Sequence, residues 1–347
     1  MSQQLINERS RKELAAKFRH ELRDEVGLSV FAGPENKAYC DFALQLCHEL
    51  NELDGRIVPT VYQGDSKEAS RLGITRTPTV LIGWDQGYKV RYTGAPIGEE
   101  AGAFIETIAL VSRGESGLQE DSKTTLQNLD RSVSIQVYVA PDCPQCPRAV
   151  LMAHQVAIES KEWVQSECVE ASQNRDLARR FNLTSVPRQV MNEDMDAVSV
   201  GVQQEADFVS DVLRYGSSRY AEIMEAEKAK RALAERLVDV PSGPVILTER
   251  NFDQAVAKYP MLVVDCWAEW CGPCRMVAPV IEGLARDYEG RIVFGKLDVD
   301  HNRELAGRYQ IMSIPTILIF KGGQLVGTKV GALPRHALEG ELLKYVD

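Results

Sequence analysis

The hydrophobic and polar positions of this chain repeat one arrangement three times. Each copy opens with an apolar run that is typical of a buried strand, and the runs cover residues 26–31, 134–139 and 261–267. An amphipathic helix, a second strand, a short polar helix, a proline and two further strands follow each run. The order β-α-β-α-β-β-α predicts a mixed sheet with helices on both faces in every copy.

A sequence motif marks the same three copies. The pattern A-x-R-Φ-x-Φ-x-x-x-P, in which Φ is a large apolar residue, occupies residues 69–78, 178–187 and 306–315. In the later two copies the first cysteine of a C-x-x-C pair lies 44 residues before the proline, from Cys143 to Pro187 and from Cys271 to Pro315. The motif and this shared spacing indicate three related structural units.

The first copy contains no C-x-x-C pair. Aligning it on Pro78 with a short gap places Lys37 and Cys40 where the other copies have their two cysteines. A single cysteine cannot form the intramolecular disulfide that ends a thiol exchange cycle. We therefore expect the first unit to be redox-inactive.

The repeat predicts an α/β chain with four segments. The segment of residues 217–240 begins with a stretch rich in Ala, Glu, Lys and Arg, which favours a helical linker. The three repeated units then occupy residues 1–120, 121–216 and 241–347.

Composition and charge argue against several classes of function. The chain has 347 residues, 44% hydrophobic and 26% charged, and a formal net charge of −10. This acidity argues against non-specific binding to nucleic acid or to anionic membranes. No apolar run approaches the roughly 18 residues of a membrane span, and the polar start lacks a secretory signal pattern, so we expect a cytoplasmic protein. No G-x-G-x-x-G fingerprint is present, and we expect no bound cofactor.

Four of the eight cysteines form two C-x-x-C pairs, Cys143/Cys146 and Cys271/Cys274. Such pairs are typical of redox sites or zinc sites. A zinc site needs further ligands, and no matching His or Cys pair lies nearby in the sequence. Both pairs also follow an apolar strand at the start of a helix, which favours redox chemistry. The remaining cysteines are expected in the core: Cys40, Cys47, Cys168 and Cys266.

The segment Val264–Arg275 resembles the thioredoxin active site, and the resemblance covers about residues 245–347. A strand delivers Cys271 to the start of a helix that we expect to begin around Cys274. Helix N-termini stabilise a thiolate, which is the nucleophile in disulfide exchange. Cys271 would attack a substrate disulfide, and the more buried Cys274 would resolve the mixed disulfide.

The same resemblance implies further roles around this pair. Asp265 would be the buried carboxylate that exchanges a proton with Cys274, and Lys296 would lie beside it. Other residues would bind substrate or set the redox potential: Trp270, Gly272, Pro273 and the cis-proline Pro315.

The segment Ala140–Ala157 resembles the glutaredoxin-like protein disulfide oxidoreductases of archaea and some bacteria, which join two thioredoxin folds. The resemblance spans about residues 10–216, and the N-terminal module of the flavoprotein reductases that serve peroxiredoxins is similar in architecture. It implies that Cys143 is the nucleophile, Cys146 resolves, and Pro187 contacts substrate.

This second unit lacks one catalytic group, because Val137 stands where the third unit has Asp265. Glu170 is either a substitute acid or a paired carboxylate at a strand end. Arg188 lowers the pKa of the Cys143 thiol, selects acidic substrates, or simply points to water.

Together these resemblances imply three tandem thioredoxin-like folds, each a mixed sheet of about four to five strands flanked by helices. The expected activity is reduction of protein disulfides at Cys271/Cys274, with Cys143/Cys146 as a relay or an independent site. Electrons would come from an NADPH-dependent flavoprotein, thioredoxin reductase, and the clients would be disulfide-containing proteins, with peroxiredoxins among the candidates. The alternatives are a protein disulfide isomerase or oxidase, and a non-catalytic scaffold that binds clients.

Overall fold

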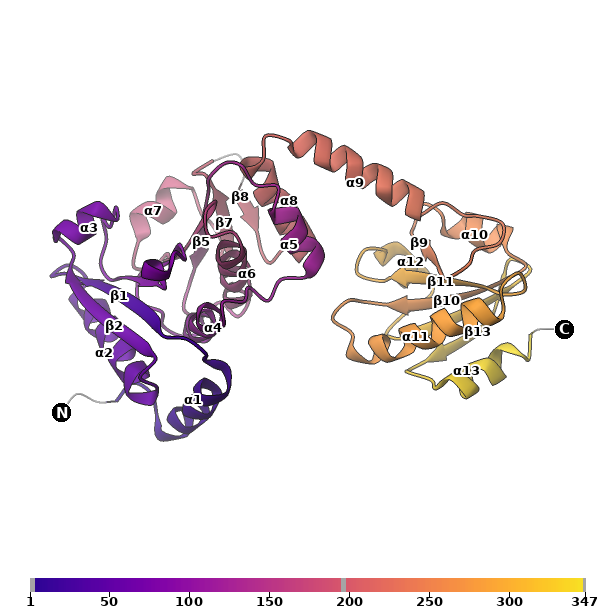
Figure 1. Ribbon diagram of the computed structural model, residues 1–347, viewed down its shortest axis with the longest axis horizontal. Helices are drawn as coiled ribbons and strands as arrows, with labels where there is room; N and C mark the ends of the chain where they lie inside the picture. Colours follow the sequence, from indigo (N-terminus) through magenta and orange to yellow (C-terminus); the bar gives the residue numbers. More distant parts are fainter. Residues whose placement is uncertain (1–3, 195–197, 346–347) are drawn as a thin grey trace. The chain divides into compact units, whose positions relative to one another are not determined.

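The computed structural model describes residues 4–194 and 198–345. It divides into two compact units, residues 1–220 and residues 221–347, and each is taken by itself below (Figure 1). The first compact unit contains the first two copies of the sequence repeat, and the second contains the third copy.

One eight-stranded sheet runs through the first compact unit, in the order β2-β1-β3-β4-β6-β5-β7-β8. Its strands are β1 (Val26–Ala32), β2 (Ile57–Gln63), β3 (Thr79–Ile82), β4 (Val90–Thr93), β5 (Val133–Val139), β6 (Val164–Glu170), β7 (Arg188–Met191) and β8 (Val198–Val200). Its helices are α1 (Glu8–Glu21), α2 (Lys37–Leu53), α3 (Lys67–Arg71), the 3-10 turn η1 (Trp84–Gln86), α4 (Glu100–Arg113), α5 (Glu120–Leu126), α6 (Cys146–Glu159), α7 (Arg175–Arg180) and α8 (Glu205–Gly216).

This sheet consists of two four-stranded halves that meet at β4 and β6. The two strands pair in parallel, with Tyr92 opposite Cys168. On one face of this seam α4 of the first half packs against α6 of the second (Figure 1). The first two repeats are therefore fused through backbone hydrogen bonds, which the sequence pattern does not indicate.

The second compact unit contains a five-stranded sheet in the order β13-β12-β10-β11-β9. Its strands are β9 (Val245–Leu247), β10 (Met261–Trp267), β11 (Val293–Asp298), β12 (Thr316–Lys321) and β13 (Gln324–Val330). Its helices are α10 (Phe252–Lys258), α11 (Gly272–Asp287), α12 (Arg303–Arg308) and α13 (Arg335–Leu342), and the exposed helix α9 (Tyr220–Ala234) leads into it. Alternate residues of β10 belong to two hydrophobic cores. Leu262 packs with Phe252 on one face of the sheet, and Val263 packs with Ile281 on the other.

The repeated motif has a structural explanation. In each copy the carbonyl of its alanine accepts the N–H of the apolar residue five positions later, at Ile74, Leu183 and Ile311, over 2.8–3.0 Å. The residue before that apolar position has a left-handed backbone: Gly73, Asn182 and Gln310. This geometry ends the short helix and sends the chain toward the proline.

All three motif prolines, Pro78, Pro187 and Pro315, follow cis peptide bonds. Each proline carbonyl also accepts an N–H, at 2.8–3.0 Å, from the glycine that comes directly after the second of the two strands following the proline. The copy without a cysteine pair has thus kept the backbone arrangement of the other two. None of the helices in the described part of the chain combines the length and apolar character needed to span a bilayer.

Candidate active sites at two cysteine pairs

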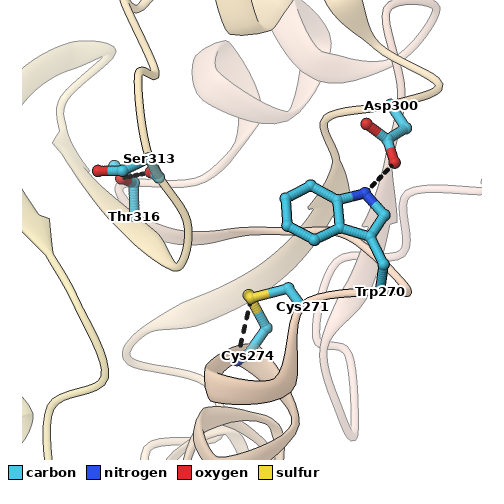
Figure 2. The surroundings of a disulfide bond; sticks show 6 residues. All are labelled: Trp270, Cys271, Cys274, Asp300, Ser313 and Thr316. Carbon is cyan, nitrogen blue, oxygen red and sulfur yellow. Dashed lines mark hydrogen bonds between the residues drawn. A yellow bond between two sulfur atoms is a disulfide. The ribbon is translucent and has the colours of Figure 1, made fainter. Parts of the chain in front are cut away.

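The third repeat places its cysteine pair at the start of α11. Cys271 is the N-cap of this helix, and its Sγ accepts the N–H of Cys274 at 3.2 Å. The two sulfurs form a disulfide, with Cα atoms 5.3 Å apart (Figure 2). The helix begins at Gly272, slightly earlier than the sequence suggests, so Gly272 and Pro273 form its first turn. Proline suits this position because the N–H groups of the first turn have no partner within the helix.

The disulfide is recessed. Cys271 is only 3% exposed and Cys274 only 2%, so the difference in exposure expected between nucleophile and resolving cysteine is very small in the oxidised form. The reason is packing, since Trp267, Val299 and Ile314 lie against the pair.

Exposed apolar side chains occur near this pair in the sequence. The indole of Trp270 is 68% exposed, and its Nε1–H donates to Asp300 at 2.7 Å (Figure 2). Met312, which comes three residues before Pro315, is 92% exposed, and Met276, in the second turn of α11, is 64% exposed. The sequence alone does not single out these methionines, because an isolated methionine carries no spacing signal.

Behind the pair, Asp265 is almost fully buried on β10. It is 1% exposed, and neither carboxylate oxygen accepts a hydrogen bond from any described residue. Burial raises its pKa to about 6, and the charge of Lys296 opposes part of that rise. Lys296 is the direct register partner of Asp265 on β11, and its Nζ lies 4.9 Å from the centroid of the Trp267 ring. A carboxyl with this pKa can take up and release a proton near neutral pH.

Pro315 completes the surroundings of the third-repeat pair. It follows the cis bond from Ile314, which packs against the disulfide. The hydroxyl of Thr316 donates to the carbonyl of Ser313 at 2.6 Å and closes the turn that carries the proline (Figure 2).

In the second repeat α6 begins at Cys146 itself, its N-cap is Gln145, and Cys143 lies in the turn before the helix. The two cysteines form a disulfide with Cα atoms 5.5 Å apart. Cys143 is 8% exposed and Cys146 is fully buried, so here the first cysteine is the more accessible of the two. Pro187 follows the cis bond from Val186.

Glu170 is not available as a substitute acid in this repeat. Its carboxylate accepts the N–H groups of Ser172 and Gln173 and the hydroxyl of Ser172, at 2.7–3.0 Å. It caps the turn after β6 and is thereby fully engaged. Arg188 contacts the hydroxyls of Thr184 and Ser185, at 3.3 and 3.4 Å.

A different buried carboxyl, Glu100, lies beside Cys168, and the sequence pattern does not point to it. Glu100, in the first turn of α4, is 1% exposed, and its Oε1 has no hydrogen-bond partner among the described residues. Its Oε2 lies 3.9 Å from the sulfur of Cys168. Cys168 pairs with Val137 in the sheet, just as Lys296 pairs with Asp265 in the third repeat. Burial raises the pKa of Glu100 to about 8.

The segment before Glu100 touches the loop that leads to Cys143. The N–H of Glu99 donates to the carbonyl of Pro141 at 3.1 Å. Glycine is required at position 98, because a Cβ there would lie 2.2 Å from the same carbonyl oxygen. The first half of the sheet therefore contributes a buried acid to the surroundings of the second-repeat pair, which no local spacing in the sequence could indicate.

In the first repeat, our sequence alignment of the two positions equivalent to the cysteine pair was wrong. The first cysteine of each pair lies four residues after the end of the preceding strand, β5 or β10. The same count from β1 leads to Asn36, not Lys37, and the second cysteine position falls on Tyr39, not Cys40. Asn36 is the N-cap of α2, and its Nδ2 donates to the carbonyl of Thr77, directly before the cis-proline, at 3.1 Å.

The four cysteines outside the pairs are buried, and all are reduced: Cys40, Cys47, Cys168 and Cys266. Burial raises the pKa of the Cys47, Cys168 and Cys266 thiols, which suits core positions. Within residues 4–194 and 198–345, no three His, Cys, Asp or Glu side chains are grouped to hold a metal ion.

Comparison with known proteins agrees with this geometry. The thioredoxin family model matches residues 243–344, and a thioredoxin domain model matches residues 133–214. Thioredoxin of Chlorobaculum thiosulfatiphilum is 48% identical over 100 residues, which are 28% of this chain and 93% of that protein. The chain belongs to the thioredoxin family. Thioredoxin of Staphylococcus aureus is 49% identical over 102 residues, covering 29% of this chain and 97% of the relative.

Solved structures resemble part of this thioredoxin family member. A protein disulfide oxidoreductase from Aeropyrum pernix K1 superposes with a TM-score of 0.55 and 33% identity, over 60% of this chain and 92% of that chain. The N-terminal domain of an alkylhydroperoxide reductase from Enterococcus faecalis shares the fold, with a TM-score of 0.54 and 20% identity, over 59% of this chain and 99% of that chain. The chain is a thiol–disulfide oxidoreductase made of thioredoxin-like folds.

Proposed function

We propose that this protein reduces disulfides of client proteins at Cys271/Cys274, using electrons from an NADPH-dependent thioredoxin reductase. The observation that carries the proposal is the disulfide at the start of α11, with an unpartnered buried carboxyl behind it and a cis-proline beside it.

The exchange balances over two steps. In the reduced enzyme the Cys271 thiolate attacks one sulfur of a client disulfide, which forms a mixed disulfide and releases one client thiolate. The thiolate of Cys274 then attacks Cys271, which closes the ring and releases the second client thiol. The client gains two electrons and the enzyme loses them. Thioredoxin reductase would return two electrons to the pair.

Asp265 would act on the second step. Cys274 must lose a proton before it can attack, and a carboxyl with a pKa of about 6 can accept that proton and later release it. Lys296, opposite Asp265 on the neighbouring strand, would keep this pKa from rising further.

The Cys143/Cys146 pair would perform the same exchange with Glu100 as its proton carrier. The raised pKa of Glu100 and its position against Cys168 support this role. Replacing Glu100 by Gln should slow resolution of a mixed disulfide at Cys143 and remove an inflection near pH 8 from its rate. A matched Glu99→Gln variant, one residue earlier, should keep that inflection. An unchanged pH profile in Glu100→Gln would refute the role.

The second pair would relay electrons to or from Cys271, or serve clients of its own. Fusion in one chain raises the effective concentration of one pair at the other to about millimolar where the linker permits contact. Cys146→Ser combined with Cys274→Ser should then accumulate a disulfide between Cys143 and Cys271, detectable by mass spectrometry. Absence of this adduct under oxidant would leave two independent sites.

Reduction of insulin disulfides by reductase and NADPH tests the main proposal. In a Cys143→Ser background, where the second pair cannot act, Cys271→Ser should abolish turnover, whereas the control Cys266→Ser, a buried thiol on the preceding strand, should leave it nearly unchanged. Turnover that survives the combined Cys143→Ser and Cys271→Ser change would overturn the assignment of the site. A scrambled ribonuclease substrate separates reduction from isomerisation, because an isomerase restores ribonuclease activity without net consumption of NADPH.

A further inference from the structure

The centre of the eight-stranded sheet is polar on one face, which is unusual for central strands. Side chains alternate along β4 and β6. Tyr92 and Cys168 point toward the buried α4–α6 face, whereas Arg91, Thr93 and Glu167 line a cavity of about 390 Å³ on the opposite face. This seam cavity lies entirely within the first compact unit and is separate from both cysteine pairs.

Two further arginines line the seam cavity, one from each half of the sheet. Arg76, in the turn before Pro78, forms an ion pair with Asp176 of the second half, with Nη1 and Oδ1 3.0 Å apart. Arg180, at the end of α7, pairs with Glu193. Both of these guanidinium groups already have a carboxylate partner.

Arg91 differs from them. Its Nε is buried without a hydrogen-bond partner, and no carboxylate of the described residues forms an ion pair with it. One Nη donates to the carbonyl of Leu72 at 2.9 Å, and the guanidinium lies 5.7 Å from the centroid of the Trp84 ring. Burial lowers the pKa of Arg91, and the charge of Glu167 offsets part of that effect.

Both carboxylate oxygens of Glu167 already accept hydrogen bonds from neutral groups. The donors are the hydroxyl of Thr93, at 2.5 Å, and the side-chain amide of Gln136, at 2.9 Å. A mostly buried cation without a direct counter-ion is costly, and an anion that reaches it recovers that cost. The planar guanidinium is suited to an oxygen anion such as a carboxylate or a phosphate.

We propose that the seam cavity binds a small anion carrying a phosphate or carboxylate group, held by Arg91. Hydroxyl and amide groups along the same walls, including those of Thr75, Ser134 and Gln165, would hydrogen-bond the rest of the ligand. The volume suits a metabolite-sized molecule.

The test uses the full-length oxidised protein in a buffer without oxygen anions, with chloride as the counter-ion. Inorganic phosphate and citrate are titrated separately by calorimetry, to about 10 mM, with thermal unfolding as a second measurement. We expect saturable binding of at least one of them and a rise in the unfolding temperature of the first compact unit. Which of the two binds more tightly decides between a phosphate and a carboxylate ligand.

Three variants decide whether Arg91 is responsible. Arg91→Gln should weaken binding by at least about tenfold, as expected for a charged hydrogen-bonding group. Glu167→Gln should tighten binding severalfold, because it removes a negative charge from the same surface while keeping its shape. Arg71→Gln, on the exposed side of α3 and outside the cavity, should bind like the parent protein.

If Arg91→Gln destabilises the fold, the Glu167→Gln variant still tests the proposal, because anion binding should become tighter in it. Absence of saturable binding by either anion would overturn the proposal. So would binding that Arg91→Gln leaves intact in a folded variant, or that Glu167→Gln weakens.

Discussion

Replacing Asp265 by Asn should change how the stability of the second compact unit depends on pH. Burial raises the pKa of Asp265 from 3.8 to about 6, whereas the unfolded chain retains the ordinary value. Between these two values the folded state holds one more proton than the unfolded state, so stability falls as pH rises. Two pKa units correspond to about 3 kcal/mol, all of it lost by pH 7.

Comparing the free energy of unfolding of variant and parent at two pH values isolates the contribution of the Asp265 ionisation. An Asn at position 265 is also buried without a partner, which adds a constant cost at every pH. Other titrating groups are common to both proteins and cancel in the difference. The free energy of unfolding of Asp265→Asn relative to the parent should therefore rise by about 3 kcal/mol between pH 3.5 and pH 7.5.

Urea unfolding of the oxidised protein measures this quantity, since the disulfide keeps Cys271 and Cys274 from titrating. The second compact unit contains Trp267 and Trp270. Replacing the two tryptophans of the first compact unit, Trp84 and Trp163, by Phe makes the fluorescence report on the second alone. The reasoning is refuted if the free energies of unfolding of parent and variant differ by the same amount at every pH from 3.5 to 7.5. Asp265 would then have the same pKa in the folded and unfolded states.

Two further predictions concern Lys296 and Gly98. Lys296→Met removes the charge that lowers the pKa of Asp265, so the same pH series should show the loss of stability extending to higher pH. Gly98→Ala would place a Cβ 2.2 Å from the carbonyl oxygen of Pro141 at a backbone φ of +68° and should destabilise the first compact unit by more than about 2 kcal/mol in urea. Gly102→Ala is its control, because a Cβ at this helical glycine meets nothing within 4 Å and should stabilise by roughly 0.5–1 kcal/mol.

The sequence predicted the thioredoxin-like folds because local chemistry determines their repeated parts. Each short helix ends at a left-handed residue, and Gly73 and Asn182 favour that backbone conformation intrinsically. The cysteine pairs are similarly local, since two thiols three residues apart at or just before a helix start can form the disulfide. Such features leave a fixed spacing that a single sequence reveals.

Glu100 shows what the sequence could not reveal. It belongs to the first half of the sheet and approaches Cys168 only because β4 pairs with β6. Nothing in the spacing between Glu100 and Cys143 records that pairing. The prediction for the first repeat was wrong for a related reason. We aligned the sequence so that Cys40 stood at the second cysteine position, whereas the end of β1 places Asn36 at the position of the first cysteine.

The pairing of β4 with β6 limits how this molecule can be divided. A fragment beginning at residue 121 would leave the backbone groups of β6 without their β4 partners, and the apolar side of α6 would lose the cover of α4. Such an open edge invites pairing with other chains. We therefore expect that a fragment carrying the Cys143/Cys146 pair must span residues 1–220, including the half that lacks a cysteine pair, to keep the fold around that pair.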